Sequence, residues 1–204
     1  MEIIPLKYGK SFLPGNMVFK NGKFEDKYPI DFIVYLVKTK DKMILIDAGC
    51  ETMPGFAMKD YIGSVNALKN HGLSTNDITD VIITHSHHDH IECVKYFKNS
   101  VIHIQRDELK LGRGYLTSDL KINSFDEEYR VCNSVRILKI GGHSVGSCVV
   151  EICDNIIVVG DECYIRECID RNIPTGASVN PEKSKDFIEK YGGGKYKLLF
   201  SHSE

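Results

Sequence analysis

Residues 84–90 place three histidines and one aspartate at the spacing of metal ligands. The segment reads Thr-His-Ser-His-His-Asp-His and follows a short β-branched run. Residues two apart in an extended chain point to the same side, so His85 and His87 should face one point beyond the strand. A turn would then bring Asp89 and His90 to a neighbouring point. Imidazole and carboxylate suit zinc, iron, manganese or cobalt, so a metal site is predicted rather than a solvated histidine-rich loop.

Three further candidate ligands occur later in the chain, each at or just beyond the end of a predicted strand. They are His143 after residues 135–140, Asp161 after residues 156–159, and His202 after residues 197–200. Seven ligands are too many for one tetrahedral ion, so two divalent ions about 3.5–4 Å apart are predicted, with a hydroxide between them. Asp161 is the candidate for a carboxylate shared by both ions. Asp89 could orient the hydroxide and later pass a proton to the leaving group.

The remaining elements are predicted from hydrophobic periodicity and turn residues. Strands are expected at 30–37, 43–46, 81–83, 101–104, 135–140, 148–152, 156–159 and 197–200, and helices within 61–71 and at 92–97, 105–111 and 182–191, with a helical turn opening at Ser74 or Thr75. Residues 1–29 predict only an early strand followed by loops. Residues 112–126 are polar and turn-like, and are a candidate flap over the site.

The overall composition narrows the class of protein. The 204 residues favour one domain spanning 1–204, and the net charge of −2 offers no basic surface for nucleic acid. The apolar runs are too short to cross a membrane, and the first residues lack the layout of a signal peptide. Seven cysteines without a CxxC spacing indicate free thiols in a reducing compartment. We therefore expect a cytoplasmic protein that acts on a small molecule; its oligomeric state stays open, a homodimer included.

The ordered ligands resemble those of the metallo-β-lactamase superfamily along essentially the whole chain. Its HxHxDH motif is matched by residues 85–90, and its later ligands by the three residues named above. The resemblance implies an α/β fold, a four-layer αβ/βα sandwich with two similar halves and a dinuclear site. It also implies a ligand set: His85, His87 and His143 for the first ion, Asp89, His90 and His202 for the second, and Asp161 between them. Zinc is the expected metal.

Within that superfamily the chain is most similar to the N-acyl homoserine lactonases. The similar segments are residues 44–50, 104–108 and 160–164. In those lactonases a tyrosine three residues after the bridging aspartate contacts the substrate carbonyl, and Tyr164 has that position. Its phenol would stabilise the oxyanion formed when a lactone or related ester is opened. Ile91 and Glu92 depart from the group, whose members have small residues there, and would narrow or charge that side of the pocket.

Other functions and other roles for these residues remain open. Thioester hydrolysis, as in the hydroxyacylglutathione hydrolases, and phosphodiester cleavage are alternatives, although the charge balance disfavours a nuclease. A metal-binding or ligand-sensing module without turnover is the non-enzyme alternative. For Tyr164, the alternative to the catalytic role is an ordinary core or rim tyrosine.

Several nearby residues are expected to serve the site indirectly or not at all. Asp47, at the end of a strand, should support a ligand through hydrogen bonds, because the ligand count is already full. His88 should point away from His87 and bind no metal. His71 and His103 are expected to be structural or surface residues. Cys163 is expected to be a buried thiol rather than a nucleophile, since no histidine outside the ligand set could activate it.

Overall fold

The protein is described by a computed structural model that covers residues 1–52, 55 and 57–203. The chain divides into two compact units. The first unit contains residues 1–10 and 32–125, and the second contains residues 11–31 and 126–204. Among the described residues, no helix combines the length and the hydropathy needed to cross a membrane.

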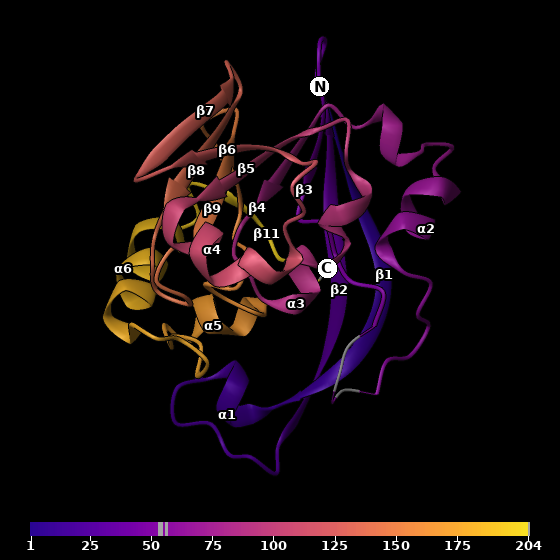
Figure 1. Ribbon diagram of the computed structural model, residues 1–204. Coiled ribbons are helices and arrows are strands. Elements are labelled where there is room, and N and C mark those ends of the chain that lie inside the picture. Colours follow the sequence, from indigo (N-terminus) through magenta and orange to yellow (C-terminus); the bar gives the residue numbers. More distant parts are fainter. Residues whose placement is uncertain (53–54, 56, 204) are drawn as a thin grey trace. The chain divides into compact units, whose positions relative to one another are not determined.

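A six-stranded sheet in the order β1-β2-β3-β4-β5-β6 organises the first unit. Its strands are β1 (Glu2–Pro14), β2 (Lys27–Lys38), β3 (Met43–Ile46), β4 (Asp80–Ile83), β5 (Val101–Gln105) and β6 (Lys121–Phe125). Its helices are α2 (Ser64–Asn70), α3 (His88–Ile91) and α4 (Arg106–Leu111), with 3₁₀ turns at Thr75–Asp77, Glu92–Tyr96 and Gly112–Tyr115. β3 to β6 are parallel, and β2 is antiparallel to β3. Figure 1 shows β1 and β2 as two long strands, whose connecting part belongs to the second unit.

The middle of this sheet is built from β-branched residues. Val81, Ile82 and Ile83 of β4 are fully buried between parallel neighbours, as expected for a strand covered on both faces. The Asp47 N–H donates to the Ile82 carbonyl at 2.8 Å. The residue that follows β3 is therefore fixed beside the end of β4, where Thr84 and the ligand segment begin.

A five-stranded sheet in the order β11-β10-β9-β8-β7 organises the second unit. Its strands are β7 (Glu128–Cys132), β8 (Val135–Lys139), β9 (Cys148–Ile152), β10 (Ile156–Val158) and β11 (Lys197–Leu199), and its helices are α1 (Gly15–Val18), α5 (Arg166–Asp170) and α6 (Pro181–Tyr191). β10 and β11 are parallel, with Val158 opposite Leu199. Asp161 follows Val158 by three positions, and His202 follows Leu199 by three. The matching offsets bring these two side chains to one edge of the sheet.

Most of the predicted elements are confirmed, but several segments differ from the prediction. Residues 121–125 form β6, which pairs with β5 along its whole length, so the prediction of a turn-like flap is wrong for this part. The predicted early strand is confirmed as β1, which spans residues 2–14. β7 and α5 were not predicted. Gln105 lies at the end of β5 and caps α4 with its side chain instead of opening the helix.

His103 is structural, as predicted, because it belongs to a buried polar network in the first unit. Its Nε2 lies 2.8 Å from Asp80 Oδ1, and Asn123 bonds to its Nδ1 at 3.0 Å. Lys42 bonds to both oxygens of Asp80, at 2.9 and 2.8 Å, and the Thr79 hydroxyl donates to one of them at 2.6 Å. Burial opposes ionisation of the Asp80 carboxyl, but these hydrogen bonds together outweigh it and hold its pKa at about 2.

The lowered pKa of Asp80 predicts a pH-dependent contribution to stability. The unfolded carboxyl titrates near 3.9, so folding favours the carboxylate by roughly 2–3 kcal/mol. This contribution is complete above about pH 4 and is lost as the pH falls toward the folded pKa of about 2. We expect Asp80→Asn to lower the free energy of unfolding at pH 7 and to approach wild type below pH 3, measured by urea denaturation. Asp41→Asn, at an exposed position, is the control. If the difference in free energy of unfolding between wild type and Asp80→Asn did not change with pH, the lowered pKa of Asp80 would be contradicted.

Candidate metal centre

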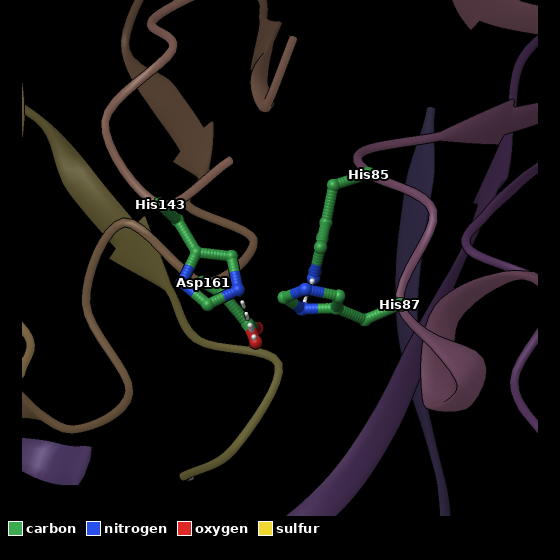
Figure 2. A group of neighbouring side chains, drawn as sticks. All are labelled: His85, His87, His143 and Asp161. Atoms are coloured by element: carbon green, nitrogen blue, oxygen red, sulfur yellow. Dashed lines mark hydrogen bonds and ion pairs between the residues drawn. The ribbon is translucent and has the colours of Figure 1, made fainter. Parts of the chain in front are cut away.

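The first unit brings its four candidate ligands together at the end of β4 and the start of α3. His85 Nε2 lies 3.0 Å from His87 Nδ1, and these two imidazoles stand edge to face (Figure 2). His90 approaches from α3, with its ring centroid 4.1 Å from that of His85. Asp89 Oδ2 is 3.5 Å from His90 Nε2. The spacing of the motif thus produces a compact group of three nitrogens and a carboxylate.

In His90 and His85 the ring nitrogen Nδ1 lies within hydrogen-bonding distance of another side chain. The buried Asp47 carboxylate accepts a hydrogen bond from His90 Nδ1 at 2.8 Å, and it also accepts from the Thr84 N–H and hydroxyl at 2.8 and 2.9 Å. The Thr84 oxygen lies 3.2 Å from His85 Nδ1. A carboxylate on Nδ1 of His90 fixes the proton there and leaves Nε2 as a lone-pair donor, which is the usual arrangement for a metal-binding histidine.

The second unit brings together its three candidate ligands around Asp161. Asp161 Oδ2 lies 3.5 Å from His143 Nε2, and Figure 2 draws this pair. Its other oxygen, Oδ1, lies 3.1 Å from His202 Nε2. All three residues are buried. One carboxylate therefore presents a different oxygen to each of two imidazoles, which is the geometry that a bridging ligand requires.

The separations between donor atoms fit the coordination of a small divalent ion. Two ligand atoms about 2.0–2.1 Å from a tetrahedral zinc ion are roughly 3.3 Å apart. The four distances given above, two in each unit, run from 3.0 to 3.5 Å. His202 Nδ1 lies 2.9 Å from the Asp31 carbonyl of β2, which supports its ring as Asp47 supports that of His90. The donor chemistry and the geometry within each unit are those of a metal site.

Tyr164 lies beside the ligands of the second unit. Its ring centroid is 5.9 Å from that of His143 and 5.2 Å from that of His202, and its side chain is buried. Cys163 is fully buried, and burial raises the pKa of its thiol well above the usual range. A thiol that resists ionisation is a poor nucleophile, in agreement with the predicted role. All seven cysteines are free thiols.

The residues around the HxHxDH motif make contacts within the first unit. His88 Nδ1 lies 3.0 Å from the Tyr115 hydroxyl, and its Nε2 lies 2.5 Å from the Thr52 carbonyl. Ile91 is fully buried. The Glu92 carboxylate accepts from the Glu51 N–H at 2.8 Å and pairs with Lys95 at 2.5 Å. The effect of Ile91 and Glu92 on a substrate stays a prediction.

Several residues that support the ligand loops were missed in the sequence. They are Thr84, the Asp31 carbonyl, Tyr8, Glu108 and Glu162. Tyr8 is fully enclosed in the first unit and donates from its hydroxyl to the Asp89 carbonyl at 2.8 Å. The only available signals were the positions of Thr84 and Glu162 directly beside His85 and Asp161. The other three come from distant parts of the chain; Glu108 belongs to the lactonase-like segment 104–108, but that similarity did not indicate a contact with the ligand loop.

The chain belongs to the Metallo-beta-lactamase superfamily, which it matches over residues 34–202. A probable metallo-hydrolase of Methanocaldococcus jannaschii is 28% identical over 159 residues, 78% of this chain and 70% of the relative. An N-acyl homoserine lactonase of Bacillus thuringiensis is 25% identical over 185 residues, 76% of this chain and 73% of the relative. Both the predicted family and the similarity to the lactonase group are confirmed.

Solved structures of the same fold cover nearly the whole chain. An N-acyl homoserine lactone hydrolase with N-hexanoyl-L-homoserine bound at its catalytic metal centre has a TM-score of 0.83 at 22% identity, covering 98% of this chain and 92% of its own. A probable metal-dependent hydrolase from Staphylococcus aureus has a TM-score of 0.85 at 20% identity, covering 100% and 89%. These likenesses confirm the predicted metallo-β-lactamase fold.

Proposed function

We propose that the protein is a metal-dependent hydrolase that opens a lactone or a related ester. In this proposal the donor groups of the two units share two divalent ions. His85, His87 and His143 would hold the first ion, Asp89, His90 and His202 the second, and Asp161 would bridge them. The observation that carries the proposal is the Asp161 carboxylate, which offers one oxygen to His143 and the other to His202. Membership of the superfamily and lactonase relatives support it.

In the proposed hydrolysis, the bound ions and the side chains Asp89 and Tyr164 would have separate roles. Bound ions would lower the pKa of a bridging water to about 7 and polarise the carbonyl under attack. Asp89, half-buried and beside His90, would orient the attacking oxygen and pass its proton to the leaving group. Tyr164 would donate a hydrogen bond from its phenol to the oxyanion of the opened carbonyl.

The proposed ligands indicate the type of metal, and the cysteines indicate the location in the cell. Five imidazoles and two carboxylates make up the seven proposed ligands, and this donor set favours zinc but also suits iron, manganese or cobalt. The substrate is proposed to be a small molecule, as for the lactonase relatives. Seven free cysteines support a reducing, cytoplasmic location.

The experiment that tests the proposed reaction is a hydrolysis panel on zinc-reconstituted protein. It should contain acyl homoserine lactones of several chain lengths, a glutathione thioester and a phosphodiester. We expect turnover of at least one lactone and loss of that turnover in Asp89→Asn. Preference for the thioester or the phosphodiester would replace the lactone proposal with that reaction. Failure to turn over any of the three classes, with Asp89→Asn indistinguishable from wild type, would contradict a hydrolase.

Tyr164→Phe tests the proposed hydrogen bond to the oxyanion. The change removes one hydroxyl and retains the ring beside His143 and His202, so metal content should not change. Loss of one oxyanion donor lowers kcat by about 10²-fold or more, and we expect a fall of roughly this size with little change in KM. Tyr129→Phe, on β7, is the matched control. An unchanged kcat with full metal content would exclude Tyr164 from the mechanism.

A further inference from the structure

Each unit contains a fully buried glutamate whose carboxylate is bonded to a loop of candidate metal ligands. Glu108 lies in the first turn of α4, and Glu162 follows Asp161 directly. Both side chains are completely excluded from solvent. Neither belongs to the proposed ligand set. Burial of a carboxylate is costly unless hydrogen bonds compensate for it, so the partners of these two residues indicate their role.

Glu162 accepts hydrogen bonds from both ends of the loop that carries His143. Its Oε1 accepts from the N–H groups of Gly142 and His143, both at 3.2 Å, and from the Ser147 hydroxyl at 2.5 Å. Its Oε2 accepts from the Ser184 hydroxyl of α6 at 3.0 Å. A single carboxylate therefore joins the start of the loop, its end and a helix.

The carbonyl side of the same loop is fixed independently. The Gly142 carbonyl accepts from the Ser178 hydroxyl at 2.6 Å and from the Asn180 N–H at 2.9 Å, and the His143 carbonyl accepts from the Val179 N–H at 3.2 Å. A Cβ atom on Gly142 would lie 2.3 Å from Glu162 Oε2, so only glycine permits this approach. The backbone that carries the His143 ring is thus held on both sides.

Glu108 repeats this arrangement in the first unit. Its Oε2 accepts from the Ser86 N–H at 2.8 Å and from the Ser86 hydroxyl at 2.6 Å. Ser86 lies between His85 and His87, whose nitrogens are 3.0 Å apart. In both units a buried glutamate therefore accepts one serine hydroxyl and at least one backbone N–H of a ligand loop.

We infer that Glu108 and Glu162 are matched positioning residues that hold the ligand loops ready to capture metal. The inference rests on the proposed metal centre and adds residues that bind neither the ions nor the substrate. Ordering a loop when metal binds would cost conformational entropy, and a loop already fixed by buried hydrogen bonds avoids that cost. Their removal should therefore weaken metal binding even where the protein stays folded.

The test is the zinc affinity of folded variants, measured by competition with a chromogenic chelator. Glu162→Ala and Glu108→Ala should each bind zinc roughly 10–100-fold more weakly, as for other partners of metal ligands. Glu162→Gln keeps an oxygen that can accept from the loop, and it should recover most of the affinity. Ser147→Ala keeps the Glu162 carboxylate but removes the hydroxyl that donates to it and that also bonds to the Ser144 backbone at 3.0 and 3.2 Å, and it should weaken binding roughly three- to tenfold. Circular dichroism of the metal-free proteins gives the folded fraction.

Glu151→Ala is the matched control, because Glu151 is a buried acid of the same unit whose carboxylate pairs with Arg136 of the neighbouring strand β8. It should bind zinc like wild type. The inference is overturned if folded Glu162→Ala and Ser147→Ala bind zinc as wild type does, or if Glu151→Ala weakens binding equally. Should Glu162→Ala and Glu108→Ala fail to fold, folded Ser147→Ala decides the question: weaker zinc binding supports the inference, and zinc affinity equal to that of wild type overturns it. Wild-type protein that binds no zinc would instead refute the proposed function.

Discussion

Asp161→Ala should strongly reduce hydrolysis and weaken the binding of both proposed ions. Asp161 supplies one oxygen to the side of His143 and the other to the side of His202, so its loss removes a ligand from each proposed ion. Outer partners of metal ligands typically contribute 10–100-fold in affinity or activity, and a shared ligand should exceed this. We therefore expect more than about 100-fold loss of kcat/KM on the preferred lactone, with bound metal measured after dialysis.

Asp170→Ala is the control for this change. Asp170 is an exposed aspartate of the same unit, paired with Arg166 at 3.1 Å, and its removal should alter neither turnover nor bound metal. Retention of two ions in Asp161→Ala would show that this carboxylate does not bridge. Loss of activity with both ions retained would assign Asp161 a different role.

Asp47→Asn should weaken metal binding while the fold is preserved. The Asp47 backbone has φ of 62°, a left-handed conformation that asparagine also adopts readily. If the amide oxygen faces Thr84, the amide NH₂ group faces His90 Nδ1 and can only donate to it. The His90 proton would then move to Nε2, the atom proposed to bind metal. We expect zinc affinity to fall roughly 10–100-fold, measured by chelator competition.

Asp80→Asn provides a close control, because Asp80 is also a buried aspartate of the first unit that bonds to a histidine ring, that of His103. It should lower stability without changing the zinc affinity of the folded protein. Equal zinc affinity in Asp47→Asn and wild type would contradict the proposed role of Asp47. Equal losses in Asp47→Asn and Asp80→Asn would point to general destabilisation.

The strands at the centre of each sheet and the ligand positions could be predicted from the sequence. Val81 to Ile83 is a β-branched run that fits a strand covered on both faces. The ligands follow such strands closely, so the spacing within the motif and the offsets after β10 and β11 were sufficient to group them within each unit. These features are local, so they can be recognised in the sequence without knowledge of the tertiary structure.

The remaining features depend on contacts between distant residues. β6 has the sequence Lys-Ile-Asn-Ser-Phe, with its first two residues exposed, and its strand state comes from pairing with β5 rather than from an apolar pattern. The Asp31 carbonyl reaches His202 across 171 positions, and a backbone oxygen leaves no trace in a sequence. Glu108 and Glu162 look like ordinary charged residues until their burial is known.

The measurement that tests the central claim most directly is the metal content of the purified chain after zinc reconstitution and dialysis. If the donor groups of the two units form a dinuclear centre, the protein retains two zinc ions per chain, and chelation removes both the ions and the lactone-opening activity together. Retention of one ion or none per chain, or lactone opening that persists after complete chelation, would contradict it.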